Sequence, residues 1–389
     1  MRSLNIVLVG AGIAGLVATR ALQRAGFRAR VYEQAPRLEE VGAGLTLSPN
    51  ATHALEAIGL GETLARISNC PPRGGVKHWR TGKTLVDIPR GGDTLARYGA
   101  AYYQLHRADL HAMLADAVRA HDPGAIVLGC KFRGLEQDGG RVEVSFENGE
   151  HVAADAVIGC DGLKSEVRAR LFGRERPRFT GYIAWRGLVP AAALRPASLE
   201  PMTCLSIGAR RAFTRYLVRG GATVNYVALS ERSDWRVESW SVRSEVGEVL
   251  REFDGWYADL RAIIAATPAQ LCYKWALFDR DPLPAWTHGR VTLLGDAAHP
   301  MLPFLGQGAA MGIEDGLVLA RAFAAAGTLD EALRRYEAAR LERTTFVMLK
   351  SRETALTYHT VDPDTYRDRT HISAETLGLM AYNPATVAV

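Results

Sequence analysis

The sequence has few cysteines, and their spacing matches no metal site or disulfide framework. Five cysteines are spread over 389 residues, without a CxxC pair or a cysteine–histidine cluster. Zinc and iron–sulfur sites need such clusters, so both kinds of site are disfavoured. The odd number and wide spacing are typical of reduced, mostly buried thiols. We therefore expect no bound metal.

Long hydrophobic runs are also missing. No uninterrupted apolar stretch reaches the roughly 18 residues of a membrane-spanning helix, so we expect no integral membrane association. The apolar run before Gly10 is too short for the hydrophobic region of a secretory signal, and no cleavage site follows it. These absences predict a cytoplasmic protein.

Basic residues are numerous but dispersed. The 47 lysines and arginines against 42 acidic residues give a formal net charge of +5, without a basic stripe. Nucleic-acid-binding proteins usually concentrate their positive charge, so we expect no nucleic-acid partner. A modest positive potential does favour anionic cofactors and substrates.

At its start the sequence contains a strand–turn–helix–strand pattern. Residues 4–9 predict a strand, residues 12–25 a helix and residues 27–33 a second strand. The turn is the glycine run Gly10-Ala-Gly12-Ile-Ala14-Gly15. Dinucleotide sites use such glycines for a tight turn, for close approach of the backbone to a pyrophosphate and for helix-on-strand packing. The pattern therefore predicts a dinucleotide site.

Glu33 ends the second strand, and Gln34 follows it. A carboxylate at this place accepts hydrogen bonds from a ribose hydroxyl, and the helix N-terminus favours the diphosphate. The unit thus predicts FAD or NAD and does not choose between them.

Two later strands end in acidic turns. Asp161-Gly162 follows one apolar run, and Gly295-Asp296 follows another. Acidic side chains at such turns can accept hydrogen bonds from sugar or ribityl hydroxyls. On the residues alone, each is equally consistent with an ordinary turn.

The length fits two lobes of ordinary domain size, and the strand–helix–strand pattern predicts an α/β fold class. Short alternating segments over residues 76–99 and 178–282 predict a mostly antiparallel sheet, the substrate domain. The remaining residues to 345 predict a discontinuous dinucleotide-binding domain, made of residues 1–75, 100–177 and 283–345. We expect residues 346–389 to form a C-terminal helical segment.

In order and spacing, the glycine run, Glu33 and the two acidic turns resemble the single-component FAD-dependent aromatic hydroxylases. The similarity extends to about residue 345. Further matches are the runs Gly42-Ala-Gly44-Leu45, His106-Arg107-Ala-Asp-Leu-His111, Gly181-Tyr-Ile-Ala-Trp185-Arg186 and Pro303 to Asp315.

This resemblance implies a Rossmann-like FAD-binding domain, with NADH or NADPH and O2 as co-substrates and a flavin C4a-hydroperoxide as the hydroxylating species. It places Arg107 near the diphosphate or flavin edge and Asp296 at the ribityl chain, with Asp161 supporting its turn. The helix from Gly308 would point its positive end at the flavin. The implied cofactor-binding residues are Gly10, Gly12, Ala14, Gly15, Glu33, Gln34, Gly44, Arg107, Asp161, Asp296, Gly306, Gln307, Gly308 and Ala309.

The resemblance also implies a small aromatic acid as substrate, of the salicylate or hydroxybenzoate type. Relatives that act on hydroxynicotinate carry histidines where this sequence has Thr46 and Phe304, which disfavours that substrate. The expected substrate-binding residues are Thr46, Trp185, Tyr216, Pro303 and Phe304, and the candidates for catalysis are Tyr216 and His299.

Several alternatives stay open at this point. The same chemistry could act on an N-heteroaromatic acid, or the FAD enzyme could be a halogenase or saturase. An NAD-dependent dehydrogenase would leave the two acidic turns without a function. A non-catalytic nucleotide-binding or sensor protein is a third alternative. The sequence leaves a homodimer open as well.

Overall fold

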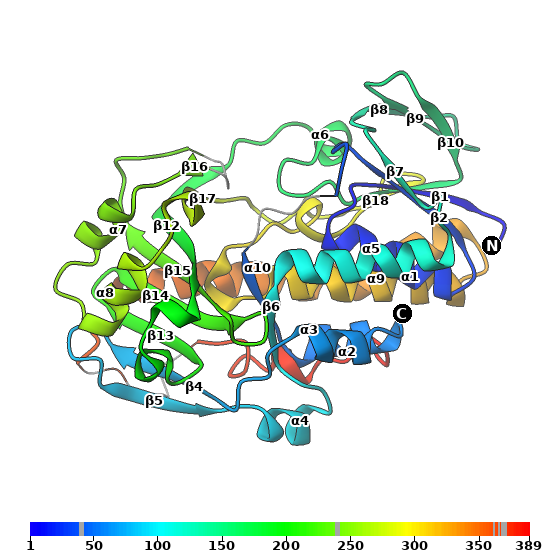
Figure 1. Cartoon of the computed structure of the whole chain (residues 1–389). Helices are drawn as coiled ribbons and strands as arrows, with labels where there is room; N and C mark the ends of the chain where they lie inside the picture. Colours follow the sequence, from blue (N-terminus) through cyan, green and yellow to red (C-terminus); the bar gives the residue numbers. More distant parts are fainter. Residues whose placement is uncertain (39–42, 238–241, 361, 365, 367–371) are drawn as a thin grey trace.

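The computed structural model describes residues 1–38, 43–237, 242–360, 362–364, 366 and 372–389. Gly42, from the glycine run before Leu45, lies outside the described residues. The chain forms two lobes that lie side by side in Figure 1, one on a parallel sheet and one on a larger, mostly antiparallel sheet.

The first lobe is centred on five parallel strands. The two strands next to each other at its centre, β11 and β1, are almost wholly buried, as expected where both faces of a parallel sheet are covered. The predicted strand–helix–strand unit is confirmed, with α1 (Ile13–Arg24) between β1 and β2. In spatial order the strands are β18 (Val291–Leu293), β11 (Ala156–Gly159), β1 (Asn5–Val9), β2 (Arg28–Glu33) and β7 (Ile126–Leu128).

Helices cover one face of this sheet and a small sheet covers the other. The helix α1 packs between α5 and α9, and α2 and α3 lie beyond these (Figure 1). On the opposite face, Tyr32 of β2 stacks on Phe146 of β9 with ring centroids 4.9 Å apart. The elements are α2 (Pro49–Ala57), α3 (Gly61–Ile67), α5 (Arg107–His121), α6 (Glu166–Phe172), α9 (Gly308–Ala325), β8 (Phe132–Gln137), β9 (Val142–Phe146) and β10 (His151–Ala154).

The second lobe is an eight-stranded sheet. The pair β13–β4 is parallel, and the other neighbouring pairs are antiparallel. In spatial order the strands are β16 (Val242–Arg243), β17 (Cys272–Asp279), β12 (Arg178–Pro190), β15 (Thr223–Glu231), β14 (Arg211–Val218), β13 (Thr203–Gly208), β4 (Arg73–His78) and β5 (Thr84–Pro89), and α4 (Gly92–Tyr98) follows β5 in the chain. The predicted α/β fold class with a mostly antiparallel second sheet is thus confirmed.

The two faces of the second sheet have different partners. Ile183 and Trp185 of β12 pack with α7 (Val246–Glu252) and α8 (Ala258–Ala265). Tyr182 and Ala184, on the other face, pack with Leu302. Side chains alternate along a strand, so the second face is the one turned toward the first lobe.

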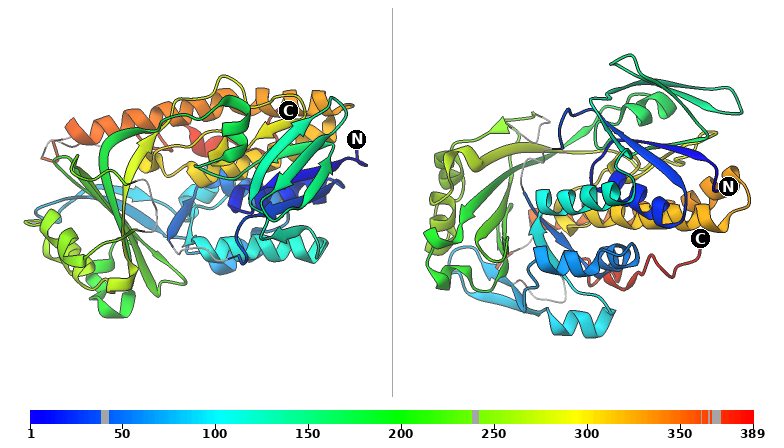
Figure 2. Two further views of the ribbon diagram at one scale, coloured as in Figure 1. Left: turned by 90° about the horizontal axis from the view of Figure 1, so that it is seen from above. Right: turned by 45° about the vertical axis from the view of Figure 1, so that its right-hand side comes forward.

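A ribbon and a long helix connect the lobes. The ribbon pairs β3 (Gly44–Leu47) with β6 (Tyr103–His106), and it contacts both α9 and β14. The helix α10 (Leu329–Thr360) runs along both lobes (Figure 2). The expected boundary near residue 345 therefore falls inside one continuous helix.

Candidate active site

The three glycines of the N-terminal turn have different surroundings. A Cβ at Gly10, where φ is +104°, would lie 2.5 Å from the carbonyl oxygen of Cys160, and one at Gly15 would lie 2.1 Å from that of Gly10. By contrast, beyond its chain neighbours no described heavy atom lies within 4 Å of a Cβ at Gly12, which precedes α1. The turn therefore leaves open space beside the free N–H groups of α1, where an anion is favoured.

Glu33 supports this turn from the end of β2. Its two carboxylate oxygens accept hydrogen bonds from the backbone N–H groups of Ala11, at 2.8 Å, and Ala35, at 2.9 Å. A carboxylate has further lone pairs, so Glu33 can also accept a ribose hydroxyl. The neighbouring Gln34 is exposed.

Ala14 lies where α1 crosses α9. A Cβ at either Gly295 or Gly312 would come within 2.9 Å of the Ala14 Cβ. Small residues at this crossing let α9 and the Gly295-Asp296 turn approach the glycine turn closely. Ala14 thus brings the two halves of the candidate site together.

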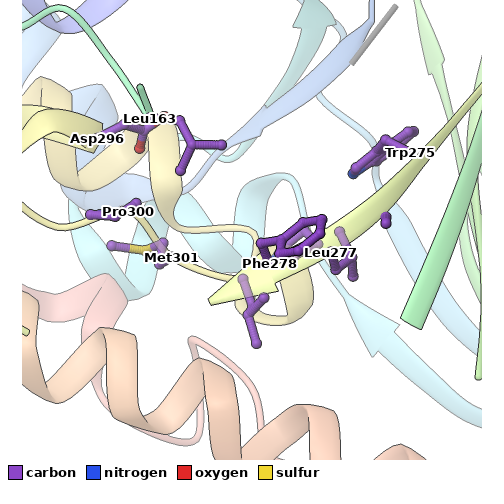
Figure 3. A pocket seen from close by; sticks show the side chains of 10 residues that line it. Leu163, Trp275, Leu277, Phe278, Asp296, Pro300 and Met301 are labelled. Atoms are coloured by element: carbon purple, nitrogen blue, oxygen red, sulfur yellow. The ribbon is translucent and has the colours of Figure 1, made fainter. Parts of the chain in front are cut away.

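The two acidic turns differ in what their side chains do. Asp161 caps α6: its oxygens accept from the hydroxyl of Ser165, at 2.5 Å, and from the N–H of Glu166, at 2.8 Å. Asp296 is the exposed residue in the otherwise buried run 291–300. It lines a cleft whose opposite wall includes Trp275 and Phe278 of β17 (Figure 3). Asp296 is therefore available to a ligand.

A loop between the lobes leads into α9. Pro303 is exposed and opens a turn over residues 303–305, and Gly306 follows with φ +63°. A Cβ at Gly306 would lie 3.3 Å from the Thr46 hydroxyl oxygen, so β3 approaches the loop here. The first turn of α9 has no acidic residue, and Gly308 and Ala309 are half-buried. The positive end of α9 is thus open to a ligand that carries negative charge.

Buried polar side chains hold the start of α9 in place. The Gln307 side-chain amide donates to the Ser48 hydroxyl at 3.0 Å, and Asn50 donates to both Gln307, at 3.1 Å, and Glu314, at 2.6 Å. All four side chains are buried. Satisfied networks of this kind make a loop rigid.

A second set of contacts continues from Glu314 to the other acidic turn. Arg340 of α10 donates to Glu314 at 2.5 Å and to Asp315 at 2.7 Å. Asp315 in turn accepts from His299, at 2.5 Å, and from the backbone N–H of Gly295, at 3.0 Å. His299, a candidate for catalysis, is therefore buried against Asp315 and holds the Gly295 turn to α9.

The face of the second sheet turned toward the first lobe has a half-exposed centre. Leu205, Thr214 and Val227, which we call the central row, lie directly opposite one another on β13, β14 and β15. All three are only half-buried although they lie mid-sheet. Phe304 packs against Tyr182 on the same face, with ring centroids 5.4 Å apart. The central row is therefore partly open on the face turned toward the first lobe.

Tyr216 lies one row away, beside β3. A Cβ at Gly44 would come within 2.6 Å of both the Tyr216 ring and the Asn225 side chain, and the Gly44 N–H donates to Asn225 at 2.7 Å. Burial raises the pKa of Tyr216 far above its ordinary value. The phenol is therefore neutral at physiological pH and acts as a hydrogen-bond donor or acceptor.

The structure does not bring Trp185 to this place. Its side chain is fully buried on the opposite face of the sheet, among residues that contact α7 and α8. Consecutive residues of a strand point to opposite faces, so the neighbouring Arg186 lies on the same face as the central row. The sequence pattern could not tell which residue of this strand faces the site.

Arg107 lies at the start of α5, near the ribbon. Its side chain is exposed, and its N–H donates to the carbonyl of Ala43 at 2.8 Å. This bond fixes the chain just before Gly44. Arg107 is thus close to the ribbon that carries Gly44 and Thr46.

Comparison with known proteins identifies the family. The family model described as FAD binding domain matches residues 3–351. The chain belongs to this family. The chain is 37% identical over 367 residues to 6-hydroxynicotinate 3-monooxygenase of Pseudomonas fluorescens, covering 93% of this chain and 94% of that protein. It is also 38% identical over 377 residues to 3-amino-4-hydroxybenzoate 2-monooxygenase of Streptomyces platensis, covering 96% and 93%.

A solved structure of a hydroxylase has the same fold as this chain. A salicylate hydroxylase substrate complex superposes with a TM-score of 0.83 at 26% identity, covering 98% of this chain and 96% of that one. The predicted enzyme class is confirmed: this is an FAD-dependent aromatic hydroxylase that uses NAD(P)H. The open Gly12, the Glu33 carboxylate and the exposed Asp296 fit FAD.

Within residues 1–38, 43–237 and the other described ranges, no helix is both long and apolar enough to cross a bilayer. The same part of the chain holds no cluster of three or more His, Cys, Asp or Glu side chains suited to a metal.

The sequence had not pointed to Arg340, Gln104 or Asn225. Arg340 is one of many arginines in a charged helix, and Gln104 and Asn225 lie in ordinary strands. A polar residue inside an apolar strand is a weak signal of a role at a site. Only the packing of the helices and the pairing of the strands show which residues these side chains contact.

Proposed function

We propose that this monooxygenase hydroxylates a small aromatic acid of the salicylate or hydroxybenzoate type. The observation that carries the proposal is the half-exposed central row, which faces the loop at Phe304 and is bordered by Tyr216. A flat apolar ring suits Leu205 and Val227, and a substituent oxygen suits the Tyr216 hydroxyl.

The positive charge for the acid group comes from Arg186 in this proposal. Arg186 is directly opposite Val227, on the same face of the sheet, and it is buried. Its guanidinium carbon lies 5.0 Å from the ring centre of Tyr273, within cation–π range. A guanidinium on this face of the sheet can donate hydrogen bonds to a carboxylate of the ligand.

We assign cofactor binding to the two halves of the first lobe. Bound FAD would accept a hydride from NADH or NADPH and activate O2 for transfer to the ring. Gly10, Gly12, Gly15 and Glu33 would hold the adenosine half, with Gln34 at its edge and Arg107 near the diphosphate. Asp296 would hold the ribityl chain. Asp161 and Ala14 would support the turns, and Gly44, Gly306, Gln307, Gly308 and Ala309 would border the flavin.

Catalysis by this chain's own residues is mainly positioning in this proposal. Tyr216 orients the substrate ring through a hydrogen bond. Its phenol keeps its proton, so it is not available as a general base. His299 acts through Asp315 by fixing the Gly295 turn, so it is a positioning residue. Thr46, Pro303 and Phe304 line the ring and exclude water from it.

The test is NADH and NADPH oxidation by the FAD-loaded protein across hydroxybenzoates, salicylate and 6-hydroxynicotinate. We expect a hydroxybenzoate to accelerate oxidation and to yield hydroxylated product in amounts that match the NAD(P)H consumed. Hydrogen peroxide is measured in parallel, because uncoupled turnover also oxidises NAD(P)H. Stimulation by hydroxynicotinate alone would instead favour an N-heteroaromatic acid. The absence of any product from all of these acids would refute the proposal.

Three further proposals concern organisation. We propose that residues 1–75, 100–177 and 283–345 act as the cofactor domain and residues 76–99 and 178–282 as the substrate domain. A cytoplasmic location is proposed on the sequence pattern alone. A homodimer is a prediction that sedimentation of the purified protein would check.

A further inference from the structure

Two buried amide side chains next to Tyr216 have unused hydrogen-bonding atoms. Asn225 is 1% exposed and Gln104 is fully buried. Among the described residues, Nδ2 of Asn225 and Oε1 of Gln104 have no hydrogen-bond partner. A buried polar atom without a partner destabilises the fold, so such atoms are uncommon unless a ligand or water meets them.

The orientation of Asn225 is fixed by a backbone donor. The Gly44 N–H donates to Oδ1 of Asn225 at 2.7 Å, so Oδ1 is the acceptor and Nδ2 remains to donate. Gln104 uses its Nε2 on the Thr203 hydroxyl at 2.6 Å, which leaves Oε1 to accept. The site therefore offers one unused donor and one unused acceptor.

Strand register places Asn225 on one side of Tyr216 and Thr203, the partner of Gln104, on the other. Thr203, Tyr216 and Asn225 lie directly opposite one another on β13, β14 and β15, one row from the central row. Gln104 reaches the Thr203 end of this row from β6, where it pairs with Thr46 of β3. Both amides thus flank the residue that we assign to ring binding.

An unpartnered amide is not by itself a site. Oε1 of Gln23 is also buried without a partner, but Gln23 lies near the end of α1 and its amide donates to Val118 in the first lobe. What distinguishes Gln104 and Asn225 is their place at the border of the half-exposed central row. Gln23 therefore provides a matched control.

We infer that Gln104 and Asn225 determine substrate specificity by reading the polar substituents of the ring. Asn225 donates to a substituent oxygen of the substrate, and Gln104 accepts from a neighbouring N–H or O–H. The substrate class is then a hydroxybenzoate with an adjacent hydrogen-bond-donating group, either amino or a second hydroxyl. This inference rests on the proposed function.

The experiment compares two ligands of nearly the same size, 3-amino-4-hydroxybenzoate and 3-methyl-4-hydroxybenzoate. Each is titrated into FAD-loaded protein while the flavin absorbance is followed, which measures binding without turnover. We expect the unaltered protein to bind the amino compound at least tenfold more tightly. Equal affinities would overturn the inference, and this comparison needs no variant.

Two variants then assign the effect to residues. Gln104→Met should bring the ratio of the affinities for the amino and methyl compounds to near unity, whereas Gln23→Met should leave this ratio unchanged. Asn225→Asp keeps the acceptor for the Gly44 N–H but replaces the unused donor. It should therefore lower the affinity for both compounds at least tenfold. FAD content and the midpoint of thermal unfolding check that each variant is folded. A preserved preference in folded Gln104→Met contradicts the role of Gln104, and unchanged affinities in folded Asn225→Asp contradict that of Asn225.

Failure of the underlying function would look different. If 4-hydroxybenzoate, salicylate and both substituted compounds all leave the flavin spectrum of the unaltered protein unchanged, the proposed aromatic-acid function fails. If they bind but the amino and methyl compounds bind equally, only the inference about Gln104 and Asn225 fails.

Discussion

Arg340 is joined to Asp315 by a hydrogen bond of 2.7 Å, and both side chains are fully buried. Through Asp315 the guanidinium is linked to the Gly295 turn, and through Glu314 it is linked to Asn50. These contacts connect α10 with both segments that border the candidate FAD site. Arg340 is thus a positioning residue that acts through Glu314 and Asp315.

Removal of this guanidinium should destabilise the whole site. Arg340→Met would remove one buried ion-pair partner from each of two buried carboxylates, leaving Glu314 with Arg343 and Asp315 with His299. Breaking a buried ion pair typically costs about 3–5 kcal/mol. We expect a lower free energy of unfolding in urea and a loss of FAD. Arg334→Met is the control: Arg334 is exposed and pairs with Asp330, so its loss should cost less than about 1 kcal/mol. Equal stability of the two variants would contradict the role of Arg340.

Acid should weaken the same contacts. Burial alone would raise the pKa of Asp315, but His299 and Arg340 outweigh it and lower the pKa to about 2. A carboxyl with a depressed pKa stabilises the fold above its ordinary pKa and loses this contribution as pH falls toward the folded value. We therefore expect stability to drop between about pH 4 and pH 2. Asp315→Asn should have lower stability at neutral pH and a smaller drop over this range; an identical drop would exclude Asp315 as its source.

Two glycines of the first turn should respond differently to alanine. Gly12→Ala meets open space and an unstrained backbone, so the free energy of unfolding should change by less than about 1 kcal/mol while FAD affinity falls. Gly15→Ala places a Cβ 2.1 Å from a carbonyl oxygen and should destabilise the protein by more than about 2 kcal/mol. Thermal unfolding and FAD titration of both apoproteins measure the contrast. Similar effects of the two changes on stability would contradict it.

Asp296→Ala should reduce FAD occupancy with little effect on folding. Asp296 is exposed, so its loss should change stability by less than about 0.5 kcal/mol. The ratio of flavin absorbance to protein absorbance reports occupancy after purification. The exposed Asp330 provides a control, because Asp330→Ala should keep full occupancy. Full flavin retention in Asp296→Ala would reject its assignment to the ribityl chain.

Tyr216 and Trp185 should separate substrate binding from stability. Tyr216→Phe keeps the ring but loses the hydroxyl, and we expect at least a tenfold rise in KM or fall in kcat with the fold intact. Trp185→Phe leaves a space in the buried core behind the sheet, so it should cost about 1–3 kcal/mol of stability. The KM for substrate should stay close to that of the unaltered enzyme. A large KM change in Trp185→Phe would place its side chain at the site after all.

Local patterns were sufficient for the glycine unit of the cofactor lobe, whereas the two acidic turns gained a role only through the family resemblance. The glycine turn and Glu33 form a short motif whose backbone geometry follows from the residues themselves, and α1 begins within one residue of its predicted start. The substrate sheet could be predicted as a sheet but not in its register. A single shift of register exchanges its two faces, and no local signal fixed which of Trp185 and Arg186 faces the central row.

The sequence and the tertiary structure determined different parts of the candidate site. By itself the sequence determined a nucleotide-binding strand–turn–helix unit, because Gly10 and Gly15 are required by contacts between near neighbours and with one parallel strand. Only the tertiary structure decided that Asn50, Gln307, Glu314, Asp315 and Arg340 form one buried network. Its members are as much as 290 residues apart in sequence, Asn50 to Arg340 (340 − 50), so their contacts depend on how whole helices pack.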